Sequence, residues 1–162
     1  MHPETPKGGV SLEQIHRGST QPGMLNYMQT FAASFGITDM RRSTRMPNTR
    51  RALAVAEFAR DHGKLDIFRE LAMDAHWKEG RDIEDSAVLR DLAAASGLDP
   101  EKAVLAADDP AYLKRLDDLR VEFKKVGTGG IPTFVFGRET VEGCQPYDLL
   151  VNVAVRAGVQ RR

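Results

Sequence analysis

The spacing of apolar residues changes once along this chain, and that change limits the folds that it can adopt. Up to residue 127 the apolar positions recur every three or four residues, which is the period of helices that bury one face. Two short β-type runs follow, Thr133–Phe136 and Thr140–Glu142, and the turn residues Gly137 and Arg138 between them predict a β-hairpin. Pro146 then opens a last helical segment. The sequence therefore predicts a mixed α/β, mostly helical fold with one C-terminal hairpin and a final helix.

Capping residues and glycines mark where the individual helices begin and end. Polar residues of the kind that cap helix N-termini precede several of the apolar runs: Asn48, Asp85, Asp99 and Asp109. Glycines, which commonly end helices, follow the runs: Gly36, Gly63, Gly80, Gly97 and Gly127. The segments 1–10 and 37–47 lack this spacing, and we expect both to be connections without regular structure.

Charge and hydropathy argue against nucleic acids and membranes as partners. The 23 Lys and Arg residues balance the 23 Asp and Glu residues, which leaves no electrostatic reason to expect nucleic acid or an anionic membrane. No apolar stretch is long enough to cross a bilayer. Residues 1–6 do not combine a cationic start with an apolar segment, as a signal peptide would. We therefore expect a cytoplasmic protein.

The chain has a single cysteine, Cys144. One thiol cannot form an internal disulfide or complete a two-thiol redox cycle, and the four histidines lack the spacing of metal ligands, so we expect no metal site. Cys144 directly precedes the last helix, where the helix dipole can activate a thiol. For this position we favour a small buried residue over a reactive thiol.

Four short motifs occur in the order in which one known family carries them. They are HPETP at 2–6, RMPNTR at 45–50, EGRDI at 79–83, and GIPTFVFG at 130–137 followed by VEGCQPY at 141–147. With these motifs the chain resembles the DsbA-like thioredoxin-domain family, in its FrnE and 2-hydroxychromene-2-carboxylate isomerase-like group. In that family a Val/Ile-Pro-Thr loop carries a cis proline before a hairpin. The resemblance implies a partial thioredoxin-like (DsbA-type) fold with a large helical insertion.

The resemblance begins in the middle of the family's pattern. The first strand, the Cys-x-x-Cys turn, the first helix and the second strand would precede Met1; in the isomerase branch a serine stands in that turn. The family pattern implies a helical insertion domain with its N-terminal linker at 1–127, and a C-terminal thioredoxin-fold part at 128–162. A coding start assigned too late, a shortened chain and a natural degenerate member are all open explanations.

The resemblance also implies where ligands would bind. In thioredoxin folds the residue before the cis proline pairs with an extended substrate peptide or with glutathione, and Ile131, Pro132 and Thr133 would hold that role here. Asn48 and Arg45 are candidates for an anion or ligand contact at a helix start, although we favour a solvated connection for this basic stretch. We assign no catalytic residue and no metal ligand.

Three functional hypotheses follow, so whether this chain is an enzyme is open. The first is a DsbA-like thiol–disulfide oxidoreductase family protein, acting on a peptide or thiol substrate, whose activity is lost or reduced because the attacking thiol pair is absent. The second is a glutathione-dependent isomerase of the 2-hydroxychromene-2-carboxylate isomerase type; outside that hypothesis we expect no cofactor. The third is a non-enzymatic binding or dimerisation module. Because Thr133–Phe136 would leave an apolar strand edge, we expect a homodimer that covers it.

Overall fold

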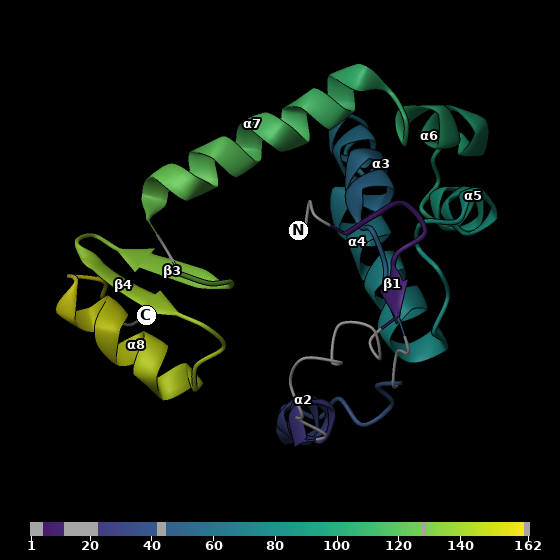
Figure 1. Ribbon diagram of the computed structural model, residues 1–162. Helices are drawn as coiled ribbons and strands as arrows, with labels where there is room; N and C mark the ends of the chain where they lie inside the picture. Colours follow the sequence, from purple (N-terminus) through teal and green to yellow (C-terminus); the bar gives the residue numbers. More distant parts are fainter. Residues whose placement is uncertain (1–4, 12–22, 42–44, 128, 161–162) are drawn as a thin grey trace. The chain divides into compact units, whose positions relative to one another are not determined.

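A computed structural model of the chain describes residues 5–11, 23–41, 45–127 and 129–160 (Figure 1). The chain divides into two compact units, which we name the helical unit, Met1–Leu116, and the C-terminal unit, Asp117–Arg162. The predicted fold class, mixed α/β and mostly helical, is confirmed. The domains predicted from the family pattern, 1–127 and 128–162, stay a prediction.

Short helices with small residues at their contacts build the helical unit. They are α2 (Gly23–Ser34), α3 (Arg50–Asp61), α4 (Leu65–Asp74), the π-helix η1 (Ala75–Glu79), α5 (Ser86–Ala95), α6 (Pro100–Ala106) and the first part of α7 (Pro110–Val126). Ala59, Ala93 and Ala103 are completely buried, and such small side chains let helix backbones approach closely. Phe68 and Leu89 fill the space that remains. This core belongs to α3–α6 and the segments that join them.

The helix boundaries follow the caps that the sequence predicts. The Asp85 carboxylate accepts a hydrogen bond from the Ala87 amide at 2.7 Å, at the start of α5. Asn48 acts one residue before the assigned N-cap of α3, because its Oδ1 accepts from the Arg50 amide at 2.9 Å. Each of the five glycines predicted to end a helix has a positive φ, which glycine adopts without steric cost.

A second, two-stranded sheet lies in the segments that we expected to be connections. Strand β1 (Val10–Ser11) pairs antiparallel with β2 (Arg45–Met46). The expectation that the segments 1–10 and 37–47 lack regular structure is therefore wrong at Val10 and at Arg45–Met46, and the C-terminal hairpin does not hold all the strands. Two residues per strand are too few for an alternating pattern, so the sequence carries no signal for this sheet.

The C-terminal unit contains the predicted hairpin and final helix. Strands β3 (Thr133–Phe136) and β4 (Glu139–Glu142) pair antiparallel through a two-residue turn, in which Gly137 has a φ of 62°. Figure 1 shows α8 (Tyr147–Arg156) lying along this hairpin. The Arg156 guanidinium is 2.9 Å from the Glu139 carboxylate, and Val153 is buried. In the part of the chain that the structure describes, no helix is both long and apolar enough to span a bilayer.

Candidate functional site

The loop that enters β3 lies at the surface of the C-terminal unit. The Ile131–Pro132 peptide bond is cis. The Ile131 side chain is 73% exposed, Pro132 is exposed, and Thr133 is half-buried as the first residue of β3. The three residues that the resemblance implies for ligand binding are thus contiguous at the surface.

Hydrogen bonds from the end of β4 hold this loop in place. The Gly143 amide donates to the Pro132 carbonyl at 2.8 Å, and the Glu142 carboxylate accepts from the Gly129 amide at 2.9 Å. Within the loop, the Thr133 hydroxyl donates to the Gly130 carbonyl at 2.5 Å. The loop is therefore fixed by the hairpin that it precedes, and a ligand would meet a preformed surface.

The register of the hairpin shows which backbone groups point away from β4. In an antiparallel pair, alternate residues exchange hydrogen bonds with the partner strand, and the bond from Gly143 to Pro132 sets the phase of that alternation. Phe134 and Phe136 accordingly exchange backbone hydrogen bonds with β4. Thr133 and Val135 direct their N–H and C=O groups to the opposite edge of β3. Among the described residues no strand pairs with that edge, and Val135 is 58% exposed.

The thiol of Cys144 is exposed, and the interpretation as a small buried residue is wrong. Cys144 lies in the connection between β4 and α8, outside both elements. It directly follows Gly143, whose amide bonds to Pro132. The single thiol of the chain therefore lies next in sequence to a residue that contacts the loop.

Asn48 and Arg45 belong to the helical unit and contact the chain's own N-terminal segment. The Asn48 side-chain amide donates to the Thr5 carbonyl at 2.9 Å, and the Arg45 guanidinium donates to the Gly8 carbonyl. An anion contact by these two residues stays a prediction. Within the described ranges, no group of three or more His, Cys, Asp or Glu side chains could hold a metal ion.

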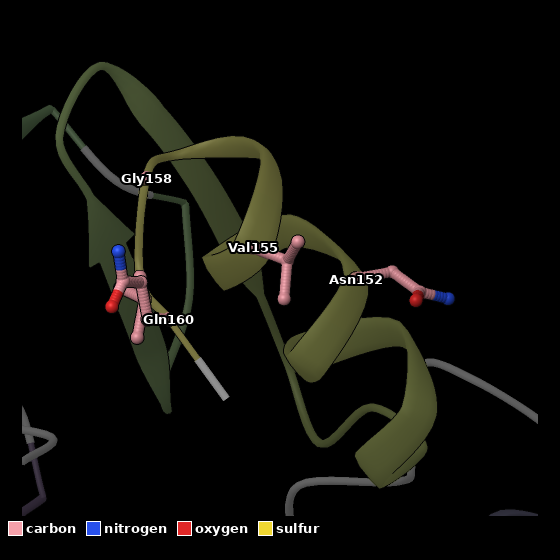
Figure 2. Close-up of a pocket in the computed structure, with 5 residues that line it drawn as sticks. Asn152, Val155, Gly158 and Gln160 are labelled. Carbon is pink, nitrogen blue, oxygen red and sulfur yellow. The ribbon is translucent and has the colours of Figure 1, made fainter. Parts of the chain in front are cut away.

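A shallow, open hollow lies at the C-terminal end of α8 (Figure 2). It is lined by Asn152, Val155, Gly158, Val159 and Gln160. Figure 2 shows the Asn152 and Gln160 side chains pointing in different directions, so the two amides do not converge on one ligand position. With no titratable side chain in its lining, the hollow offers no acid–base or nucleophilic chemistry.

Comparisons with known proteins agree with the motifs. A family model described as DSBA-like thioredoxin domain matches residues 2–154. Among solved structures, the crystal structure of a probable DsbA oxidoreductase from Streptomyces coelicolor matches with a TM-score of 0.73 at 23% identity. That match covers 85% of this chain and 60% of the other, so the chain spans about three-fifths of the length of that protein. No curated protein matches. At this identity the structural likeness shows the shared fold.

Proposed function

Because the chain belongs to the DsbA-like thioredoxin-domain family, we propose that it is the peptide-binding part of a thiol–disulfide oxidoreductase. In this proposal an extended substrate peptide lies along the loop at Ile131 and the free edge of β3. The observation that carries the proposal is this exposed loop, which Glu142 and Gly143 hold in place. The exchange itself needs two thiols, and the 162 residues contain one cysteine.

Main-chain hydrogen bonds supply the affinity in the proposed complex. An extended peptide that adds to a sheet edge pairs with alternate residues of the strand beside it, here Thr133 and Val135. The side chain of Ile131 offers the peptide an apolar contact next to these two residues. Because backbone groups do the binding, the site accepts peptides of many sequences, as a thiol–disulfide oxidoreductase of unfolded chains requires.

Cys144 has a limited part in this proposal. The thiolate of an exposed cysteine beside the loop can attack a substrate disulfide, which releases one substrate sulfur as a thiolate and leaves the other in a mixed disulfide with Cys144. The 162 residues hold no second thiol to release that mixed disulfide, so release depends on the external dithiol, and the chain should reduce insulin no faster than that dithiol does by itself. An insulin-reduction assay with dithiothreitol tests this: we expect the rate of the uncatalysed control, and clear catalytic turnover by the chain would reject the proposal.

Peptide binding can be tested separately from turnover. Val135→Pro removes the outward N–H donor, and proline is tolerated at a strand edge, whereas Val135→Ala keeps that donor and removes only side-chain contacts. With a fluorescein-labelled, alkylated insulin B chain as the probe, we expect Val135→Pro to bind about tenfold more weakly in fluorescence anisotropy. Equal affinity of the proline and alanine variants would contradict strand addition.

In the absence of peptide, we propose that a second copy of the chain covers the free edge of β3. A two-fold axis at Phe134 would place Thr133 of one copy opposite Val135 of the other, so that both outward residues of each β3 are paired. This homodimer would join two hairpins into one four-stranded sheet and remove an exposed apolar edge. Sedimentation of a strict monomer at micromolar concentration would contradict it, and the insulin peptide should compete with it.

The finer hypotheses about this chain stay predictions. Membership of the FrnE group, glutathione-dependent isomerase activity, a non-enzymatic binding role and a cytoplasmic location each need their own test. For the isomerase hypothesis the direct test is glutathione binding by calorimetry, with the Val135→Pro variant as the control for the same edge.

A further inference from the structure

The segment 5–11, which we call the N-terminal strap, is attached to the helical unit by polar contacts. In Figure 1 the strap is the purple segment that carries β1. The Gly8 amide donates to both carboxylate oxygens of Glu84, at 2.9 and 3.0 Å. The Gly8 carbonyl accepts from Arg45, and the Thr5 carbonyl accepts from the Asn48 side chain at 2.9 Å. The pairing of β1 with β2 completes the attachment.

Glu84 is an unusual partner for a backbone amide because it is a buried carboxylate. Its relative exposure is 7%, and within the described ranges it forms no salt bridge with a lysine or an arginine. Its own backbone is fixed, because its amide donates to Asp82 at 2.9 Å and its carbonyl accepts from Arg51 at 2.5 Å. A buried carboxylate without a cation depends on amide donors, and charge-assisted bonds of this kind are stronger than neutral ones.

The hydrophobic core of the helical unit is built from residues outside the strap. Its buried cluster runs from Ala52 to Ala107 and includes no residue of the segment 5–11. Detaching the strap therefore removes no member of this cluster, and the contacts that it breaks include those of the buried Thr5. Such a segment can open locally while the helices stay folded.

Close approach of the two backbones sets a second condition for the attached state. Gly9 has a φ of 70°, and a Cβ at this position would lie 2.6 Å from the Met46 carbonyl oxygen. Only glycine fits between the strap and β2 at this point, so a single methyl group should push the strap away. The attachment can thus be weakened by a substitution in the strap, at Gly9, or independently by one in the helical unit, at Glu84.

We propose that the segment 5–11 is a releasable strap, which alternates between a state docked on the helical unit and an open state, and that Glu84 is the latch that holds the docked state. In the docked state the Gly8 amide donates to the Glu84 carboxylate. In the open state Glu84, the Asn48 amide and the edge of β2 become accessible to other partners. Glu84 is a positioning residue in this device and has no catalytic part.

Amide hydrogen exchange of the full chain tests the latch. Glu84→Gln keeps the shape of the side chain and removes its charge, so we expect the Gly8 amide to exchange about tenfold faster or more. Gly9→Ala should give the same pattern from the strap side. In both variants the core amides of Val55 and Leu89 should keep their protection.

Two control variants separate the latch from general destabilisation. Glu101→Gln removes an exposed carboxylate that pairs with Arg90, and Gly63→Ala adds a methyl at a positive φ where no atom lies within 4 Å. Neither should change the exchange of Gly8 relative to the wild type. An unchanged Gly8 rate in Glu84→Gln, or equal loss of protection in Gly8 and Val55, would overturn the proposal.

The wild-type protein gives an independent test that does not depend on a variant folding. If the strap opens locally, low concentrations of urea should hardly change Gly8 exchange, whereas Val55 exchange should rise steeply with urea. Equal urea dependence of the two amides would mean that the strap unfolds only with the core, and would likewise overturn the proposal.

Discussion

The two units of this molecule bury their apolar residues to very different extents. Among the described residues, every buried hydrophobic side chain except Val153 lies in the helical unit. The C-terminal unit is not poor in apolar residues, since Ile131, Val135 and Tyr147 are between 58% and 77% exposed. The helical unit thus has a closed core, whereas the C-terminal unit presents apolar groups and unpaired strand backbone. From this difference we expect stability to depend mainly on the first unit, and the proposed peptide binding to use the second.

The largest expected effect concerns the core of the helical unit. Phe68 is 1% exposed and is among the largest fully buried side chains, so Phe68→Ala should lower the free energy of unfolding by about 3–5 kcal/mol through lost burial and a cavity. Trp77 is the only tryptophan and lies in η1 of the same unit, so its fluorescence in urea titrations reports this transition.

The matched control for Phe68→Ala is Leu105→Ala. Leu105 is a large apolar residue of the same unit but is 74% exposed, so its truncation should change the free energy of unfolding by no more than about 0.5 kcal/mol. Similar losses in the two variants would mean that the closed core does not determine the stability of the helical unit, and the comparison of the units would fail.

A smaller effect is expected for the buried residue of the C-terminal unit. Val153→Ala removes two methyl groups from a site that is 6% exposed, which should cost about 1.5 kcal/mol in the stability of that unit. Because Trp77 lies in the helical unit, its fluorescence transition should not move, whereas hydrogen exchange of the Val141 amide in β4 should accelerate. A shift of the Trp77 transition by the same amount would show that the two units unfold together.

Local signals predicted most of the secondary structure. Asp85 and Asp99 start helices because their carboxylates accept backbone amides two or three residues ahead, a relation that the sequence alone contains. The hairpin turn was predictable for the same reason, since Gly137 supplies the positive φ that a two-residue turn requires. Structure that depends on neighbours in sequence could therefore be inferred from the sequence.

Contacts between distant residues could not be inferred in this way. The β1–β2 sheet joins Val10 to Met46, and the latch joins Gly8 to Glu84, and neither pair leaves a periodic pattern. The exposure of Cys144 was missed for a related reason: a position before a helix says where a residue lies along the chain but not what covers it. The candidate loop at Ile131 was found through its motif, whereas the free edge beside it required the strand register.

Mild acid should distinguish the two units, because all four histidines lie before residue 77. Burial lowers the pKa of His76 below its ordinary value of 6.5, against the opposing effects of a hydrogen bond with the Arg81 backbone and the charge of Asp82. The unfolded chain then takes up the proton more readily than the folded one. The contribution of His76 to stability is complete above about pH 6.5 and is lost as the pH falls through the lower folded-state pKa.

Urea titrations followed by Trp77 fluorescence at pH 7.5 and at pH 5 would measure this effect. We expect the helical unit to lose stability at the lower pH, and His76→Gln to reduce that loss. Exchange protection in the C-terminal unit, which contains no histidine, should change less, after correction for the pH dependence of intrinsic exchange. A wild-type and a His76→Gln protein with identical pH dependence would contradict the assignment to His76.

The smallest expected effect concerns the ion pair that joins α8 to β4. Arg156 and Glu139 lie 2.9 Å apart, but their side chains are 65% and 45% exposed, so water and salt screen the attraction. A double-mutant cycle of Arg156→Ala and Glu139→Ala should therefore give a coupling energy of about 0.5 kcal/mol or less, falling further at high salt. Exchange of the Val141 amide is again the measurement, because the Trp77 signal does not report this unit. A coupling several times larger would mean that polar contacts, and not the burial of Val153, hold α8 on the hairpin. The C-terminal unit would then owe its stability to a different kind of interaction from the helical unit.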